Sequence, residues 1–343
     1  MSDPLIYTVG WICAVEPEAV AAGSLLDDEH ESPQRRDPRD TNVYKLGSIA
    51  GHNVVIASLP SGEYGTNSAA VVAANLLRSF PNVRIGLLVG IGGGAPSHRH
   101  DIRLGDVVVG VPGDGKGGVI QYDMGKRRQG QAFEQTGCLN ASPVLLRTAV
   151  AALRATYARK GHSLGQDIAG ALNRWPRMRR TYSRPGVRDI LYRSQCVRGE
   201  EDCGGRLSRD GGSSANIVER QLRDGEEDPT IHYGLIASAN TLMKDAEARD
   251  QISEKHNILC FETIAAGLMN HFPCLVICGI CDYADSHENK VWQGYAAMTA
   301  AAYAKDLLRQ LPATDVEREQ RLEKHLNSCE RASYTLQHFD EPR

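Results

Sequence analysis

The chain has 343 residues, a formal net charge of −3 from 39 Lys and Arg against 42 Asp and Glu, and 41% hydrophobic residues. This composition indicates a globular chain with a core, and it excludes the global positive charge that holds nucleic acid or an anionic membrane. The apolar runs are far shorter than the ~20 residues of a membrane helix. Nine scattered cysteines, several inside apolar runs, favour buried thiols in a reducing compartment. We therefore expect a cytoplasmic protein.

Taken in chain order, the residues predict strands alternating with helices. The expected strands cover 6–15, 44–49, 53–59, 83–89, 106–111, 231–237 and 274–280, and the expected helices cover 66–79, 142–160, 246–255, 262–270 and 294–311, with a further helix beginning near 16–18. Continuous apolar strands between helices are typical of a sheet covered on both faces. The fold class is therefore expected to be α/β and layered.

Two regions depart from this pattern. Residues 161–229 contain an arginine cluster at 174–184 followed by segments rich in Gly, Ser, Asp and Glu, which predicts an insertion that is partly disordered or weakly packed. The cluster could hold phosphates, although a solvated basic face is the simpler interpretation. After Pro312 the chain is polar and charged. We therefore expect one domain over 1–312, including the insertion, and a polar tail or linker over 313–343.

The strongest physical signal is the glycine-rich run Gly90-Ile91-Gly92-Gly93-Gly94, directly after the strand expected at 83–89. Glycines at the carboxyl end of a strand allow backbone N–H groups to approach a ligand closely. The run is not a dinucleotide fingerprint, because Ala95 and Pro96 follow where a glycine and a capped helix are needed. A ligand contact and a simple tight turn both remain open.

Two carboxylates also follow predicted strands. Asp282 comes after the strand at 274–280, a position where ligands bind in α/β sheets, and a partly buried carboxyl there can act as a general acid. Capping of a turn is the alternative for Asp282. Glu18 follows the first strand, and a surface-helix glutamate is the alternative there.

Two metal-like or redox-like patterns are weak. Cys278 and Cys281 form a C-x-x-C pattern, but it lies in a predicted buried strand and not at a helix start, which disfavours redox or zinc chemistry. His98 and His100 form an H-x-H pair without a third ligand nearby, as solvated loop histidines do. We expect no metal and no cofactor.

Several motifs occur together and in order, and as a set they carry a resemblance. They are 7-YTVGWICA-14 with Glu18, 62-GEYG-65, 89-VGIGGGAP-96, 103-RLGDVVV-109, 121-QYD-123, 234-GLIAS-238, 261-FE-262 with 265-AAGL-268, and 279-GICDYADSH-287. This set resembles the purine and uridine phosphorylase superfamily, and more narrowly the fungal nucleoside-phosphorylase-like domains. Within that superfamily, 5′-methylthioadenosine/S-adenosylhomocysteine nucleosidase is the nearer catalytic template.

The resemblance implies a three-layer nucleoside phosphorylase-like fold with a twisted mixed, mostly parallel central sheet. It also implies cleavage of a purine N-glycosidic bond, with Asp282 protonating the base and Glu18 activating water. The substrate-binding residues that it implies line the glycine run, the segment after the strand at 231–237, and the motif near 262. They are Gly90, Ile91, Gly92, Gly93, Leu242, Met243, Phe261, Glu262, Thr263, Ile264 and Cys278.

The resemblance also shows departures from the family. The positions where phosphorylases carry an arginine and a hydroxyl residue are Leu88 and Ile91, which favours hydrolysis over phosphorolysis. The family glutamate that clamps the ribose hydroxyls is Ile264, and an arginine of close relatives is Cys278. Glu262 is two residues away from the clamping position and is expected to point elsewhere on a helix.

Three functions therefore remain open. The chain hydrolyses purine nucleosides or nucleotides with a weakened ribose grip, or it acts on a less polar substrate, or it is a non-catalytic nucleoside-binding or oligomerising module. The partners expected are a nucleoside-like small molecule and further copies of the chain, without nucleic acid or membrane.

Overall fold

The computed structural model describes residues 1–343 except 132, 199–215, 224–227, 288–289 and 325–343. Its strands are β1 (Val9–Cys13), β2 (Asp28–His30), β3 (Tyr44–Ile49), β4 (His52–Ser58), β5 (Ile85–Gly94), β6 (Val107–Gly110), β7 (Val119–Gln121), β8 (Gly125–Lys126), β9 (Glu134–Gln135), β10 (Ile231–Ser238), β11 (Ile258–Glu262) and β12 (Cys274–Asp282).

The α-helices are α1 (Glu16–Ser24), α2 (Thr66–Ser79), α3 (Val144–Lys160), α4 (Leu164–Arg174), α5 (Arg179–Tyr182), α6 (Ala246–His256), α7 (Gln293–Arg309) and α8 (Ala313–Arg318). Short 3₁₀ helices are η1 (Pro4–Ile6), η2 (Pro176–Met178), η3 (Ala265–Gly267) and η4 (Lys290–Trp292). Helix α2 has the predicted bounds. The predicted helix over 262–270 is wrong, since only the single 3₁₀ turn η3 forms there.

One mixed sheet organises the molecule. Its strands run in the order β11-β10-β6-β12-β5-β1-β4-β3-β2, and β7 adds to β10. Strands β1, β4, β5 and β12 are mutually parallel, whereas β6 runs antiparallel to β12. Because β11 also pairs with β5, the five strands from β5 through β12, β6 and β10 to β11 close into a ring. The expected twisted, mostly parallel mixed sheet is confirmed.

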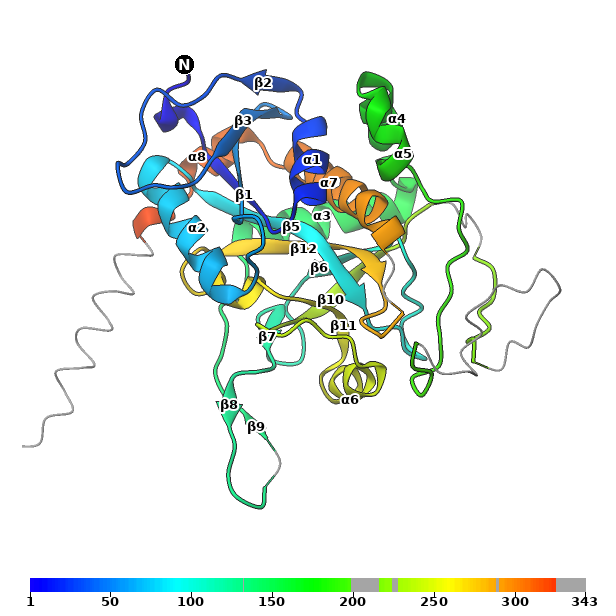
Figure 1. Ribbon diagram of the computed structural model, residues 1–343. Coiled ribbons are helices and arrows are strands. Elements are labelled where there is room, and N and C mark those ends of the chain that lie inside the picture. The colour runs from blue at the N-terminus through cyan, green and yellow to red at the C-terminus, as the bar shows by residue number, and fades with distance from the viewer. Residues whose placement is uncertain (132, 199–215, 224–227, 288–289, 325–343) are drawn as a thin grey trace, which may run out of the picture.

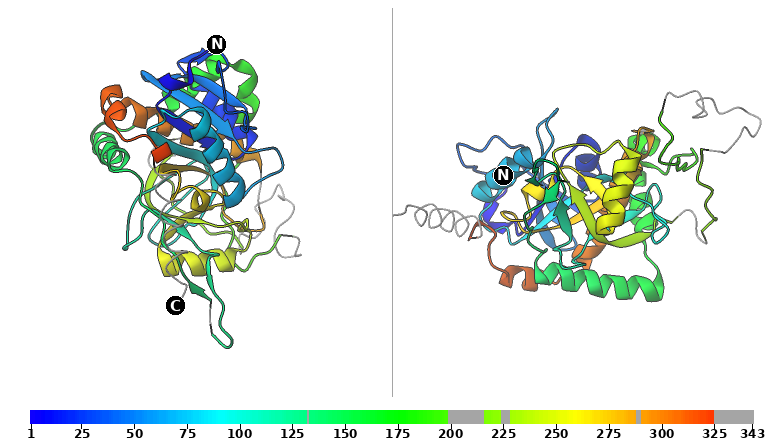
Figure 2. Two further views of the ribbon diagram at one scale, coloured as in Figure 1. Left: turned by 90° about the vertical axis from the view of Figure 1, so that its left-hand side faces the viewer. Right: turned by 90° about the horizontal axis from the view of Figure 1, so that it is seen from below.

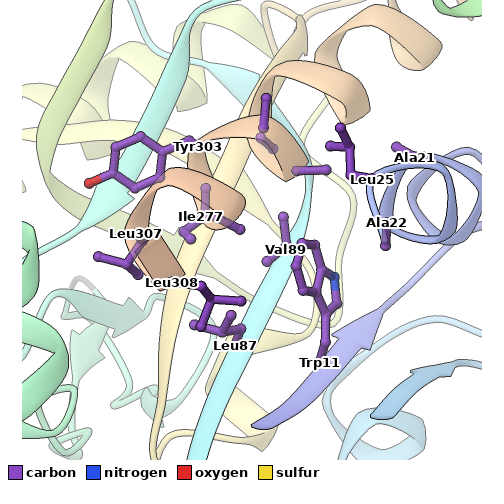
Figure 3. Close-up of a cluster of buried hydrophobic side chains, with 14 of the residues drawn as sticks. Trp11, Ala21, Ala22, Leu25, Leu87, Val89, Ile277, Tyr303, Leu307 and Leu308 are labelled. Atoms are coloured by element: carbon purple, nitrogen blue, oxygen red, sulfur yellow. The ribbon is translucent and has the colours of Figure 1, made fainter. Parts of the chain in front are cut away.

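Helices cover both faces of the sheet, which confirms the three-layer α/β class. On one face, α1 and α7 pack over β1, β5 and β12, and Trp11, Val89 and Ile277 meet Leu25 and Leu308 there (Figure 3). The other face carries α2 and η3. Helix α3 lies along the outer edge of the molecule (Figure 2), and the β8–β9 hairpin projects from its body (Figure 1).

The start of the expected insertion is packed more firmly than its composition predicts. Helix α4 places Leu164, Ile168 and Leu172 in the same apolar cluster as α7, and Tyr182 of α5 joins them. The expectation of weak packing is therefore wrong for 164–182, because one apolar face of α4 finds α7. Much of the Gly-, Ser-, Asp- and Glu-rich part lies outside the described residues.

The expected tail also begins with packed residues. Val316 of α8 and Leu322 are buried, and the Leu322 N–H donates to the carbonyl of Val83 at 2.9 Å. The chain past Pro312 therefore stays on the domain through at least Leu322. Within the described residues, no helix has both the length and the apolar character to cross a membrane.

Candidate active site

Glu18 is buried at the start of α1 and its carboxylate faces the glycine-rich strand. The side chain is 4% exposed, so the alternative of a surface-helix glutamate is wrong. One carboxylate oxygen accepts from the backbone N–H groups of Ala14 and Val15, in the short connection between β1 and α1. The other, Oε1, accepts from the N–H of Ile91 at 2.8 Å.

Gly90 makes room for this carboxylate. A Cβ atom at Gly90 would stand 2.6 Å from Glu18 Oε1, which is far inside van der Waals contact. The run Gly90–Gly94 is not a turn, as one alternative had it, but the last half of β5, paired with β12 and β11. Its glycines are required by close approach and not by chain reversal.

Burial raises the pKa of Glu18 to about 7, with a smaller contribution from the charge of Glu262. The three N–H donors from Ile91, Ala14 and Val15 oppose this shift by stabilising the charged form. A carboxyl with this pKa is divided between its acid and base forms at neutral pH. That is the condition under which a general base works well.

Asp282 ends β12 opposite Gly93 of β5. Its Oδ1 accepts from the N–H of Ala284 at 2.8 Å, and the thiol of Cys281 donates to Oδ2 at 3.2 Å. A Cβ atom at Gly93 would lie 2.7 Å from Oδ1. Asp282 does cap the turn at 283–284, as one alternative proposed, but it does so while lying against the same glycine-rich strand as Glu18.

Both carboxylates therefore meet one strand end. Glu18 contacts β5 at Gly90 and Asp282 contacts it at Gly93, and the Cα atoms of two such strand positions are about 10 Å apart. The sequence places Glu18, Asp282 and the glycine run each after an expected strand, and in the structure both acids contact that run. That the two acids act on one substrate stays a prediction.

Glu262 ends β11, and the protein's own backbone occupies its carboxylate. It accepts from the N–H of Ile264 at 2.8 Å and of Ala265 at 2.9 Å, and Ser238 adds a side-chain hydrogen bond. Burial raises the pKa of Glu262, and these donors oppose the shift. Glu262 therefore holds the turn through Thr263 into η3, and its expected position on a helix is wrong.

Ile264 and Cys278 lie in the apolar layer under α2. They are 3% and 2% exposed and belong to the same cluster as Leu88. A hydrogen bond with the Cys260 thiol, reinforced by burial, raises the pKa of Cys278 well above its usual range. Cys281 belongs to the cluster on the opposite face of the sheet. The pair Cys278 and Cys281 therefore cannot share a disulfide or a metal ion.

A third apolar cluster stands beside Asp282. Phe261 and Ala284 are buried in it, Met243 packs against it, and the ring of Tyr122 meets Phe261 edge-on at a centroid distance of 5.6 Å. Leu242 is instead 54% exposed. Sequence reasoning assigned no role to Tyr122 or to Ser238, although both stand in quoted motifs at strand ends. Burial raises the pKa of Tyr122 to about 12, so it is a neutral hydroxyl here.

The histidine pair and the arginine cluster singled out in the sequence lie outside the site around Glu18 and Asp282. His100 pairs with Asn257 at 3.2 Å, and among the described residues no group of His, Cys, Asp or Glu is arranged to hold a metal ion. In the arginine cluster, Arg174 donates to the carbonyl of Leu26 and Arg184 lies over the Trp292 ring. One thiol departs from the expected reduced state, since Cys196 is disulfide-bonded.

Comparison with known proteins shows which family the sequence resembles. The family model of the phosphorylase superfamily matches residues 8–166, which include Glu18 and the glycine run. Over these residues the chain is similar to the phosphorylase superfamily. The resemblance seen in the sequence is thereby confirmed.

Solved structures show the same fold at low identity. The 5′-methylthioadenosine/S-adenosylhomocysteine nucleosidase of Neisseria meningitidis has a TM-score of 0.54 and 17% identity over 89% of this chain and 99% of that one. Futalosine hydrolase of Helicobacter pylori has a TM-score of 0.53 and 16% identity over 89% of this chain and 99% of its own.

A nucleotide-binding leucine-rich repeat (NLR)-like protein of the fungus Hyaloscypha variabilis is 46% identical over 316 residues, or 89% of this chain. This chain spans 29% of that relative's length.

Proposed function

We propose that this phosphorylase-superfamily domain hydrolyses the N-glycosidic bond of a purine nucleoside or nucleotide. The observation that carries the proposal is Glu18: a buried carboxylate with a pKa of about 7, fixed by three backbone N–H groups against the glycine-rich end of β5. Such a group is positioned and charged to take a proton from water. The solved nucleosidase and futalosine hydrolase relatives support the same reaction class.

The proposed reaction divides the proton transfers between two carboxyls. The C1′–N9 bond breaks, its electron pair stays with the purine, and protonated Asp282 gives a proton to N7 of the leaving base. A water oxygen bonds to the anomeric carbon of the oxocarbenium-like ribose while Glu18 accepts the water proton. The products are the free base and the sugar. The cluster formed by Phe261, Met243 and Ala284 supplies an apolar wall for a planar base beside Asp282.

Hydrolysis is favoured over phosphorolysis by the residues beside Glu18. Leu88 is buried and apolar, and the N–H of Ile91 donates to the Glu18 carboxylate, so it is not available to a phosphate. A phosphate dianion needs several charged or hydroxyl donors, and neither side chain supplies one.

A less polar substrate is the second candidate, and the position of Ile264 favours it. Ile264, Cys278 and Leu88 share one apolar cluster where the resemblance predicts a ribose clamp. A charge-assisted clamp contributes about 1.5–3 kcal/mol or more, so its loss weakens any hold on ribose. If the missing clamp abolishes turnover entirely, the chain is a nucleoside-binding module and not an enzyme.

Chromatography of the full chain with adenosine, inosine, ATP and methylthioadenosine tests the proposal. We expect free base to appear without added phosphate, and to disappear in the Glu18→Gln and Asp282→Asn variants. No base from any substrate would refute the nucleosidase proposal. If phosphate is required, the reaction is phosphorolysis. A rise in melting temperature with nucleosides but no turnover would favour the binding module.

A further inference from the structure

A cavity of about 580 Å³ lies apart from the Glu18 and Asp282 side chains. Its walls come from the loop at 96–103, from 191–194 and 218–223 on either side of the undescribed part of the insertion, and from Arg249 and Asp250 of α6. This volume falls in the range of about 300–1,000 Å³ that small-molecule sites occupy.

Arginines are the most frequent charged residues in the wall of this cavity, although the chain as a whole carries −3. The acidic residues of the wall are Asp101 and Asp250. The arginines are Arg103, Arg193, Arg220, Arg223 and Arg249. Asp106 and Asp189 also pair with the wall arginines Arg223 and Arg220, at 3.0 and 2.9 Å. Five positive charges therefore stand against four negative ones, and a concave shape concentrates the field of the surplus charge on whatever enters.

The arginines are held in place before any ligand arrives. Arg249 is 2% exposed, and its guanidinium donates to the carbonyl of Tyr283 and to Asp250, both at 2.7 Å. Arg223 donates to Asp106 through Nη1 at 3.0 Å, whereas its buried Nη2 finds no partner among the described residues. Its Nε donates to Asp101 at 3.1 Å, so two carboxylates fix the orientation of this side chain.

The same cavity has an aromatic and apolar wall. Tyr192 lines it, and its ring is stacked on His287 with a centroid distance of 3.9 Å and an interplanar angle of 14°. Leu191 and Val218 stand beside it. The His287 ring fixes the plane of Tyr192, which suits the tyrosine for contact with a flat ligand group.

We infer that this cavity binds a nucleotide-class ligand, with its phosphate groups on the arginines and its planar part against Tyr192. Arg249 ties the cavity to the site described above, because it holds the carbonyl of Tyr283, the residue after Asp282. The inference concerns a separate cavity, and it does not depend on whether the Asp282 site turns over a substrate.

Isothermal titration calorimetry of the full chain with ATP, pyrophosphate and adenosine measures the three affinities and tests the inference. We expect ATP to bind most tightly, pyrophosphate more weakly and adenosine weakest, with affinity for ATP falling as salt rises. Arg193→Gln removes an exposed arginine of the wall and should weaken ATP binding about tenfold, while Arg193→Lys should retain part of the affinity.

Arg177→Gln is the matched control, since Arg177 is equally exposed, carries the same charge and lies outside the cavity wall. It should bind ATP like the unmodified protein. Equal affinity of the Arg193→Gln variant and the unmodified protein would overturn the inference, as would adenosine binding as tightly as ATP. Pyrophosphate binding as tightly as ATP would overturn the nucleotide assignment.

The Asp282→Asn variant separates this inference from the proposed function. ATP binding that is unchanged in Asp282→Asn and about tenfold weaker in Arg193→Gln supports the cavity whether or not base is released. Loss of binding in Asp282→Asn alone would place the nucleotide at the other site and overturn the inference.

Discussion

Glu18 Oε1 accepts a hydrogen bond of 2.8 Å from the backbone N–H of Ile91, a residue 73 positions further along the chain. The contact joins the first turn of α1 to the glycine-rich half of β5. It is possible because Gly90 has no side chain to fill the space that the carboxylate occupies.

The rate of base release should depend on the ionisation of Glu18. Burial raises the pKa of Glu18 to about 7, and the water-activating form is the deprotonated one. The rate should therefore fall about tenfold per pH unit below 7. Glu18→Gln should lower the rate at least about 100-fold at pH 8. Glu16→Gln, two residues away on the exposed side of α1, should leave the rate and its pH profile unchanged.

Asp282→Asn should abolish protonation of the leaving base while the fold persists. The amide oxygen can still accept from the Ala284 N–H, so the melting temperature should change little. Loss of a general acid lowers the rate by about 10²–10⁴-fold. Asp114→Asn, in an exposed turn, serves as the control for a lost carboxylate. Base release at the original rate in Asp282→Asn would contradict the assigned role.

Gly90→Ala should destabilise the protein and displace Glu18 at the same time. The new methyl would lie 2.6 Å from Oε1, and overpacking of a buried site costs about 1–3 kcal/mol. The melting temperature and the rate of base release should both fall. Gly23→Ala, where nothing lies within 4 Å of the added methyl, should leave the melting temperature equal or higher. Equal melting temperatures of Gly90→Ala and Gly23→Ala would show that the close approach of Glu18 does not restrict position 90 to glycine.

Ile264→Glu, the substitution that would rebuild the family ribose clamp, should lower stability. Ile264 is 3% exposed in an apolar cluster, and a carboxyl there loses its hydration without a partner in place. We expect a loss of about 3 kcal/mol or more in the free energy of unfolding, measured by denaturant titration. Ile264→Leu keeps the volume and should cost less than about 1.5 kcal/mol. A stable glutamate variant with faster base release would show instead that this position faces the substrate.

Part of the candidate site followed from local sequence pattern. Glu18, Asp282 and the glycine run each stand just after a predicted apolar strand, and parallel strands bring their carboxyl ends to one edge. The bounds of α2 were likewise predictable from its apolar spacing. The role of Glu262 was not, because the helix expected at 262–270 is a single 3₁₀ turn that its carboxylate caps.

The sequence by itself determined the alternation of strands and helices, the resemblance to the phosphorylase superfamily and the residue types at the strand ends, because these depend on neighbours within a few positions. Only the tertiary structure decided that Glu18 is buried and that Gly90 leaves room for its carboxylate. It also decided that Cys278 and Cys281 face opposite sides of the sheet. The same holds for the arginine-lined cavity, whose walls come from segments over 100 residues apart. Burial and pKa depend on which distant segments pack together, and the local pattern does not contain that information.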